Sequence, residues 1–221
     1  MDFRPKAILF DLDGVLINTE PLHGRAWYQA AEFFGTHLTK KQIISLRGRR
    51  RLDCAEQIIK WIEKPIDMKE FLAVHKPISK GLLNSPNAMD GAKELISLFN
   101  QDKIPLALVT SSTLISLHLK CKKYKWLMQI GTKVCGDDKD LQEGKPSPQP
   151  YLLAAKRLGI NPNSCWAIED SKSGISSALK AGCGVWVLDQ DNSIGFEERN
   201  KQAKRVNNLY EIIDKYIELK N

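Results

Sequence analysis

The octapeptide Ala7-Ile8-Leu9-Phe10-Asp11-Leu12-Asp13-Gly14 joins a continuous apolar run to a pair of aspartates. Four apolar residues without polar alternation are typical of a strand that is buried on both faces of a parallel sheet. The aspartates follow directly, where such a strand would end. Because ligands of open α/β sheets bind beyond the carboxyl ends of the strands, these two carboxylates are candidates for chemistry.

The same pattern recurs further along the chain. Apolar runs at Leu106–Val109, Trp166–Ile168 and Gly184–Leu188, and a weaker one at Lys133–Cys135, are candidate strands. The segments between them carry apolar residues on one helical face, namely Ala92, Leu95, Ile96 and Phe99 in one segment and Tyr151, Leu152, Ala155 and Leu158, closed by Gly159, in another. Strands that alternate with helices predict an α/β fold with a doubly wound parallel sheet.

The segment from residue 18 to residue 88 interrupts this alternation and contains no convincing strand. Its apolar residues recur at helical spacing, namely Leu52, Ala55, Ile58, Ile59 and Ile62, and then Met68, Phe71 and Leu72. We therefore predict two domains. Residues 1–17 and 89–221 form the α/β core, and residues 18–88 form an inserted, all-helical cap domain.

The composition places the chain among globular proteins. It has 221 residues, of which 43% are hydrophobic and 27% charged, so disorder is excluded as a description of the whole chain. The apolar runs fall far short of the roughly 20 residues of a membrane span, and residues 1–6 lack a signal-peptide pattern. The five cysteines include no C-x-x-C pair, which disfavours a disulfide framework or a zinc site and predicts a reducing, cytoplasmic location.

The net charge of +7 indicates anionic partners, which could be nucleic acid, a membrane surface or phosphorylated small molecules. Residues 18–88 hold 12 Lys/Arg and 7 Asp/Glu, and the remainder holds 21 and 19, so most of the excess lies in the predicted insert. It includes Arg47, Arg49, Arg50 and Arg51. This excess has two interpretations: a solvated basic face, or a lid that meets an anion.

Three of the predicted strands end in polar residues. Asp11 and Asp13 follow the first strand, Thr110, Ser111 and Ser112 follow the second, and Glu169 and Asp170 follow a third. In a parallel sheet all three ends face one crevice, where four carboxylates repel one another unless a cation lies between them. Carboxylate oxygens favour Mg²⁺, and Lys145 could add a fixed ammonium group. Each motif alone occurs often by chance, whereas their combination at strand ends does not.

Four ordered motifs, Asp11–Leu16, Val109–Ser112, Gly144–Pro146 and Ile168–Ser171, resemble those of the haloacid dehalogenase superfamily. The helical insert resembles the cap of its phosphatase and β-phosphoglucomutase branch. The resemblance extends from about Lys6 to Leu209 and implies a Rossmann-like core.

The resemblance implies a role for each motif residue. Asp11 would attack phosphorus to form an aspartyl-phosphate, and Asp13 would be the general acid and then the general base. Dehalogenating members lack this second aspartate, so it favours phosphoryl chemistry. Mg²⁺ would be held by the Asp11 carboxylate, the Asp13 carbonyl and Asp170, with Glu169 nearby. The phosphate oxygens would be held by Thr110, the amide of Ser111 and Lys145.

Residues of the insert point to the substrate only through a loose alignment with the mutases. His23 falls where those enzymes place a helper of the general acid, and Arg51 and Lys76 fall where they hold a second phosphate. Alternatively, His23 is an ordinary residue of a helix face, and Arg51 and Lys76 are solvated surface residues. Glu20, followed by Pro21, is more typical of the phosphatases.

Three features depart from the family pattern. Asn18 and Gln149 stand where relatives often have aspartate. At Gln149 the aspartate that would support the Lys145 loop is missing. The stretch 136–143 is longer and more acidic than usual.

The leading hypothesis is a Mg²⁺-dependent phosphatase that acts on a small phosphorylated metabolite, with a phosphosugar as the favoured class. The alternative is a β-phosphoglucomutase. A third possibility is a phosphonate hydrolase, which needs a cap lysine, and the many lysines of the insert do not exclude it. A non-catalytic nucleic-acid-binding protein ranks low, because the four motifs are intact and no aromatic residues interleave with the arginines. We expect a small-molecule substrate, no nucleic-acid or membrane partner, and a monomer rather than an oligomer.

Overall fold

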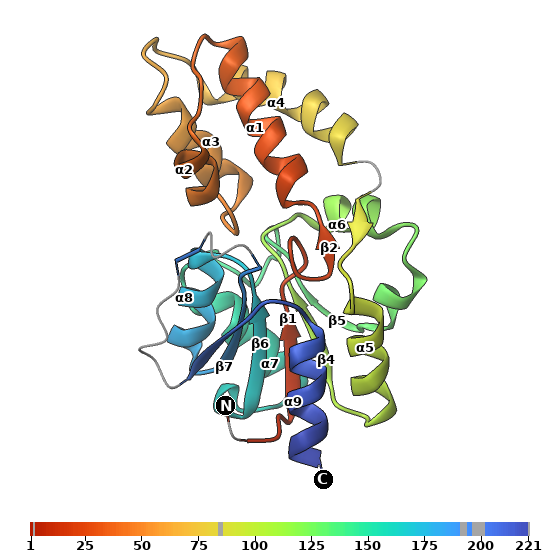
Figure 1. The fold of residues 1–221 in the computed structure, drawn as a ribbon. Coiled ribbons are helices and arrows are strands. Elements are labelled where there is room, and N and C mark those ends of the chain that lie inside the picture. The colour runs from red at the N-terminus through yellow and green to blue at the C-terminus, as the bar shows by residue number, and fades with distance from the viewer. Residues whose placement is uncertain (2, 84–85, 191–193, 196–201, 221) are drawn as a thin grey trace.

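The computed structural model describes residues 1, 3–83, 86–190, 194–195 and 202–220. A six-stranded, all-parallel sheet forms its centre (Figure 1), with the strand order β5-β4-β1-β6-β7-β8. The strands are β1 (Ala7–Phe10), β4 (Leu106–Val109), β5 (Thr132–Val134), β6 (Cys165–Glu169), β7 (Gly184–Leu188) and β8 (Ala203–Val206). The predicted α/β class and parallel sheet are confirmed.

Four of the sheet strands are completely buried, which explains why their sequences are continuous apolar runs. The sequence does not predict β8, because this edge strand buries only Ala203 and Val206 and exposes Lys204 between them. An edge strand of this kind carries too few apolar residues to stand out.

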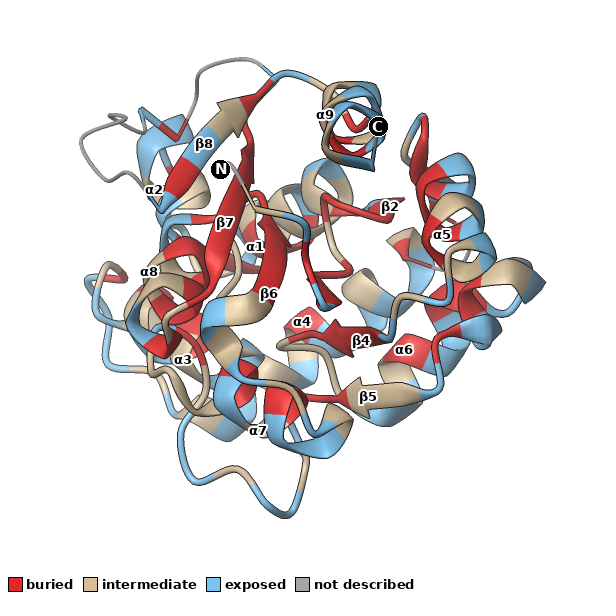
Figure 2. Cartoon of the chain, turned by 90° about the horizontal axis from the view of Figure 1, so that it is seen from below, coloured by how far each residue is buried: buried red, intermediate tan, exposed pale blue. Residues whose placement is uncertain are grey.

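Helices cover both faces of the sheet, because successive side chains of β1 point to opposite faces and all of them are buried. Ile8 and Phe10 pack with α5 (Ala92–Gln101) and α9 (Tyr210–Lys220), and Ala7 and Leu9 pack with α7 (Gln149–Leu158) and α8 (Lys172–Ala181). Figure 2 shows the buried strands between helices whose outer faces are exposed. The remaining core elements are the helix α6 (Leu114–Cys121) and the short 3₁₀ helices η1 (Lys125–Gln129) and η2 (Pro162–Ser164).

The predicted helical faces need two corrections. Leu152 is 42% exposed, because α7 turns Tyr151, Ala154 and Ala155 toward the sheet instead. Leu52 is 59% exposed at the start of its helix. Gly159 ends α7 with the left-handed backbone (φ +69°) that glycine adopts most readily.

Four helices form the insert, and they lie beyond the ends toward which the sheet strands point (Figure 1). They are α1 (Glu20–Phe33), α2 (Lys40–Ser45), α3 (Arg51–Ile59) and α4 (Met68–Leu82). They share a hydrophobic cluster of their own, which includes Trp27 and Phe71. The boundaries predicted for the two domains remain a prediction.

The expectation of no strand within residues 18–88 is wrong in one detail. Two antiparallel strands, β2 (Ile17–Asn18) and β3 (Asn87–Ala88), pair where the chain enters and leaves the helical insert. Strands of two residues are too short to produce a periodic pattern.

All five cysteines are buried as free thiols. Within the described part of the chain, no helix combines the length and the apolar character that crossing a bilayer requires.

Candidate active site

The polar strand ends meet because their strands are neighbours. β1 lies between β4 and β6, so Asp11, Thr110 and Glu169 stand at three adjacent carboxyl ends of the sheet. All three side chains are buried. The sheet topology therefore brings residues from distant parts of the sequence into one site.

Lys145 connects the ends of all three strands. Its Nζ donates to Asp11 Oδ1 at 2.5 Å, to Glu169 Oε1 at 2.5 Å and to the Val109 carbonyl at 2.9 Å. Burial alone would lower the pKa of Lys145, but the two carboxylates outweigh it and raise this pKa above its ordinary value. Lys145 is therefore a fixed positive charge directly beside the candidate nucleophile.

Glu169 holds Lys145 in place through further hydrogen bonds. Its Oε1 accepts from the hydroxyl of buried Tyr151 at 2.6 Å, and its Oε2 accepts from Ser171 Oγ at 3.1 Å. Both carboxylate oxygens thus have protein donors. Apolar helical spacing was the only sequence signal for Tyr151.

Asp11, Glu169 and Asp170 form a buried acidic cluster whose ligand atoms lie within 4.8 Å of one another. Asp170 Oδ1 is buried and has no hydrogen-bond partner among the described residues. Burial, together with Glu20 and Asp11, raises the pKa of Asp170. Burial also raises the pKa of Asp11 to about 7, against the opposing effect of Lys145. A cluster of this kind suits a divalent cation.

Gly14 makes room for this cluster. Its backbone is left-handed (φ +89°), and a side chain at this position would collide with the Asp170 carboxylate. The glycine after the two aspartates is therefore required by both backbone conformation and space.

Asp13 lies beside the cluster and accepts from several donors. Lys120 Nζ donates to Oδ1 at 2.6 Å, the hydroxyl of Thr19 donates to the same oxygen, and Ser112 Oγ donates to Oδ2 at 2.9 Å. Burial would raise the pKa of Asp13, but the surrounding groups, Lys120 foremost, outweigh it and hold this pKa well below its ordinary value. The structure thus shows Asp13 in surroundings that favour the ionised form.

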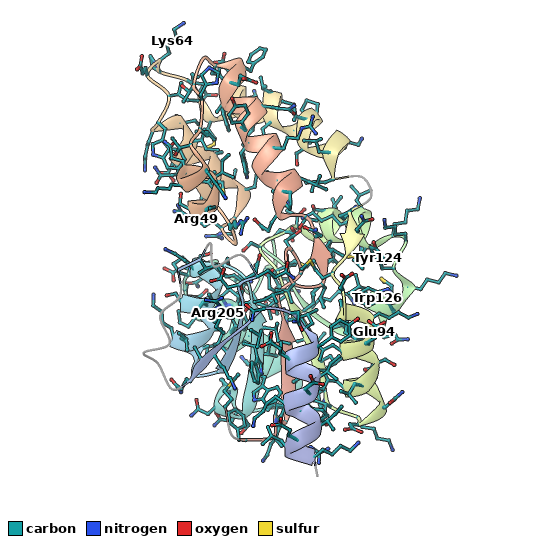
Figure 3. The ribbon with its side chains drawn as sticks, viewed as in Figure 1. Arg49, Lys64, Glu94, Tyr124, Trp126 and Arg205 are labelled. Carbon is teal, nitrogen blue, oxygen red and sulfur yellow. The ribbon has the colours of Figure 1, made fainter. Side chains whose placement is uncertain are left out.

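A cavity of about 400 Å³ lies between the insert and the core. Asp11 and Asp13 contribute to its core side, together with Ser111 and Ser112. The insert contributes the basic residues Arg47, Arg49, Arg50 and Arg51. Figure 3 shows Arg49 at the base of the insert, where it approaches the core. The basic excess seen in the sequence therefore lies opposite the carboxylates.

The loop between α2 and α3 contacts the core directly. Ser111 Oγ donates to the Gly48 carbonyl at 2.8 Å, and Ser173 Oγ donates to the Arg47 carbonyl at 3.1 Å. The Arg47 guanidinium pairs with Glu20 at 3.2 Å. Burial raises the pKa of Glu20 to about 8 despite this pair. These contacts close the insert over the cavity.

Of the three residues of the insert that the loose alignment selects, two line the cavity and one does not. His23 and Arg51 line the cavity. Lys76 is exposed on α4 and does not, because one helical position rotates a side chain by about 100°. Its neighbour His75 lines the cavity instead and stacks on Trp27 with 3.6 Å between the ring centroids. Burial lowers the pKa of His75 to about 3, so its ring is neutral.

Gln149 and the acidic stretch 136–143, which depart from the family pattern, both make contacts within the core. Gln149 Oε1 accepts from the amides of Gln142 and Glu143 at 3.1 and 2.9 Å, so an amide supports the Lys145 loop. In the acidic stretch 136–143, Asp138 and Asp140 pair with Arg157 at 2.6 and 2.8 Å. Arg157 therefore offsets part of the charge of this stretch.

Comparison with known proteins places this geometry in a family. The model described as haloacid dehalogenase-like hydrolase matches residues 8–188. The chain is 31% identical over 205 residues to a Drosophila melanogaster protein named "Probable pseudouridine-5'-phosphatase", covering 90% of this chain and 87% of that protein. It is 31% identical over 183 residues to hexitol phosphatase A of Escherichia coli, covering 82% of each.

A solved structure extends the comparison to the whole fold. The crystal structure of an Entamoeba histolytica HAD hydrolase, family IA, variant 3, has a TM-score of 0.78 at 28% identity and covers 97% of this chain and 99% of that one. Sequence motifs, family model and fold agree. The chain is an enzyme that belongs to the haloacid dehalogenase-like hydrolase family, within its phosphatase and phosphoglucomutase-like branch.

Proposed function

We propose that the enzyme is a Mg²⁺-dependent phosphatase that hydrolyses a small phosphorylated metabolite, with a phosphosugar as the favoured class, through an aspartyl-phosphate. One observation carries the proposal: Asp11 lies beside the fixed charge of Lys145, and it shares with Asp13 a cavity roofed by arginines. The resemblance to phosphatases supports the reaction class.

In the first step an Asp11 oxygen forms a bond to phosphorus and the ester P–O bond breaks, while Asp13 gives its proton to the leaving oxygen. The anionic ester beside Asp13 favours the protonated carboxyl that this step requires. In the second step a water attacks phosphorus and gives a proton to Asp13, and the bond to Asp11 breaks. Lys145 offsets the negative charge beside Asp11 in both steps.

Thr110, the amide of Ser111 and Lys145 are the proposed holders of the phosphate oxygens. Lys145 and Ser111 meet the geometric requirement best, because Lys145 touches Asp11 and Ser111 lines the cavity. Thr110 Oγ1 accepts from the Ser112 amide at 3.0 Å and shapes the turn that presents these groups.

The acidic cluster fits a divalent cation, as the unpartnered oxygen of Asp170 indicates. We propose that Mg²⁺ is held by the Asp11 carboxylate, the Asp13 carbonyl and Asp170, with Glu169 contributing charge from behind. When bound, the cation would neutralise charge on the phosphoryl oxygens.

We expect Mg²⁺ to raise the unfolding temperature of the wild type by about 5–10 °C at saturating concentration, because binding to the folded state alone stabilises it. Asp170→Asn is expected to lose most of this shift. Glu63→Gln, an exposed carboxylate of the insert, should keep it. Differential scanning fluorimetry with and without MgCl₂ measures the effect, and an equal shift in Asp170→Asn would exclude the proposed ligand.

Arg51→Ala is expected to lower kcat/KM about 10- to 100-fold, because a hydrogen bond between a guanidinium and an anionic or polar substrate group is lost. Lys76→Ala is the matched control and should leave kcat/KM unchanged, since Lys76 is exposed outside the cavity. Steady-state kinetics measure kcat/KM of both variants on the phosphate ester that the wild type hydrolyses fastest. Equal effects of the two substitutions would remove Arg51 from the proposed site.

The alternative function is that of a β-phosphoglucomutase, which the closed insert and its basic residues favour. A panel of sugar phosphates with Mg²⁺ separates the two functions when both free phosphate and isomerised product are followed. Phosphate release supports the phosphatase, and conversion of β-glucose 1-phosphate to the 6-phosphate, primed by the bisphosphate, supports the mutase. The described residues that line the cavity include no lysine, so nothing in them favours a phosphonate hydrolase.

We propose a small phosphorylated substrate, no nucleic-acid or membrane partner, a monomer and a cytoplasmic location. The five buried thiols fit a reducing compartment.

A further inference from the structure

Lys120 is a buried lysine that no sequence motif selects. It projects from α6, it is 2% exposed, and its Nζ contacts Asp13 Oδ1 at 2.6 Å, His23 Nε2 at 2.9 Å and Ser112 Oγ at 2.9 Å. Taking an ammonium group out of water costs several kcal/mol unless partners compensate. A lysine buried at such a position, against the candidate acid–base residue, points to a role in the reaction.

The contact with His23 fixes the protonation of that ring. A lysine ammonium only donates, so His23 Nε2 accepts and the ring proton lies on Nδ1. Burial, together with Lys120, lowers the pKa of His23, which agrees with a neutral ring. His23 Nε2 lies 3.5 Å from Asp13 Oδ1 and has no proton to give it. Of Lys120 and His23, therefore, only Lys120 donates directly to Asp13, and His23 acts on Asp13 through Lys120.

The donors are distributed unequally over the Asp13 carboxylate. Oδ1 accepts from both Lys120 and Thr19, whereas Oδ2 accepts from Ser112. Oδ1 is thus the anchored oxygen. Oδ2 keeps a lone pair for a further partner, and Asp13 lines the cavity in which that partner would lie.

We propose that Lys120 is a positioning residue, which anchors Asp13 through Oδ1 so that Oδ2 meets the leaving oxygen, and which links this arrangement to the insert through His23. The inference rests on the proposed phosphatase function. It adds a core residue of α6 to the machinery of proton transfer and joins α6 to α1 of the insert across the cavity.

The test compares two leaving groups. An alkyl phosphate such as glycerol phosphate needs a proton on its leaving oxygen, whereas p-nitrophenyl phosphate releases a stable anion. Lys120→Met is expected to lower kcat for the alkyl ester about 100-fold, the lower range of general acid catalysis, and kcat for the aryl ester less than about threefold. Lys122→Met, at an exposed lysine of the same segment, should change neither value.

Lys120→Gln keeps a donor without the charge and serves as a second variant if Lys120→Met does not fold. It should show the same preference for the aryl ester with a smaller loss. An equal loss for both esters in the folded variant overturns the positioning role, because a structural role affects both reactions alike. Failure of the wild type to hydrolyse either ester, or equal rates in Asp11→Asn, would instead overturn the proposed function.

Discussion

Asp11→Asn is expected to lower kcat for every phosphate ester by at least about 10⁴-fold, the scale seen when an enzyme loses its nucleophile. The amide has no anionic oxygen with which to attack phosphorus, although it can still accept a hydrogen bond from Lys145. The substitution also removes one of three carboxylates crowded within 4.8 Å, so the fold is expected to persist. Activity and structure should therefore separate clearly in this variant.

Two measurements check this result. Phosphate release gives the rate, and mass spectrometry of protein quenched in acid during turnover should detect a phosphoryl adduct on the wild type and none on Asp11→Asn. Asp90→Asn, at an exposed core carboxylate, is the control and should retain both rate and adduct. An Asp11→Asn protein that turns over at the wild-type rate would refute the nucleophile assignment.

Lys145→Met is expected to damage stability as well as activity. Removal of this ammonium leaves Asp11 and Glu169 buried without their counter-charge, and the loss of one partner from a buried ion pair costs about 3–5 kcal/mol. In a chain of this size the unfolding temperature should fall by roughly 6–20 °C. Phosphate release should fall below detection, because the fixed charge beside the nucleophile is gone.

The double variant Lys145→Met/Glu169→Gln tests the cause. If uncompensated charge destabilises Lys145→Met, neutralising Glu169 should restore part of the unfolding temperature without restoring activity. Lys139→Met, at an exposed lysine, should match the wild type in both respects. Thermal unfolding in metal-free buffer measures the effect, and no recovery in the double variant would argue against the electrostatic explanation.

The sequence predicts the sheet and the motif residues well because one physical pattern determines both. β1, β4 and β7 have the predicted bounds, since strands buried on both faces exclude polar residues. The carboxyl ends of β1, β4 and β6 then place Asp11, Thr110 and Glu169 together without knowledge of any helix. Topology alone fixes that part of the candidate site.

Residues contributed by helices are harder to predict, because their direction depends on how each helix packs. Lys76 and His75 are adjacent in sequence, yet only His75 reaches the cavity. Lys120 follows the buried Leu117 by three positions, and that helical spacing was the available signal that it faces inward. The sequence could not show what Lys120 meets there, since Asp13 lies 107 positions away.

The pairing of β2 with β3 has a consequence for how substrate enters and product leaves. Among the described residues, the insert joins the core through one two-stranded ribbon, and its hydrophobic cluster shares no buried residue with the two clusters of the core. Swinging the insert away therefore exposes no packed interior. The motion must break two hydroxyl-to-carbonyl hydrogen bonds at the Arg47–Gly48 loop, together worth about 1–3 kcal/mol, and also the contact between Lys120 and His23. Substrate can thus enter and product leave the cavity when the insert pivots as a rigid body, while the insert and the core both stay folded.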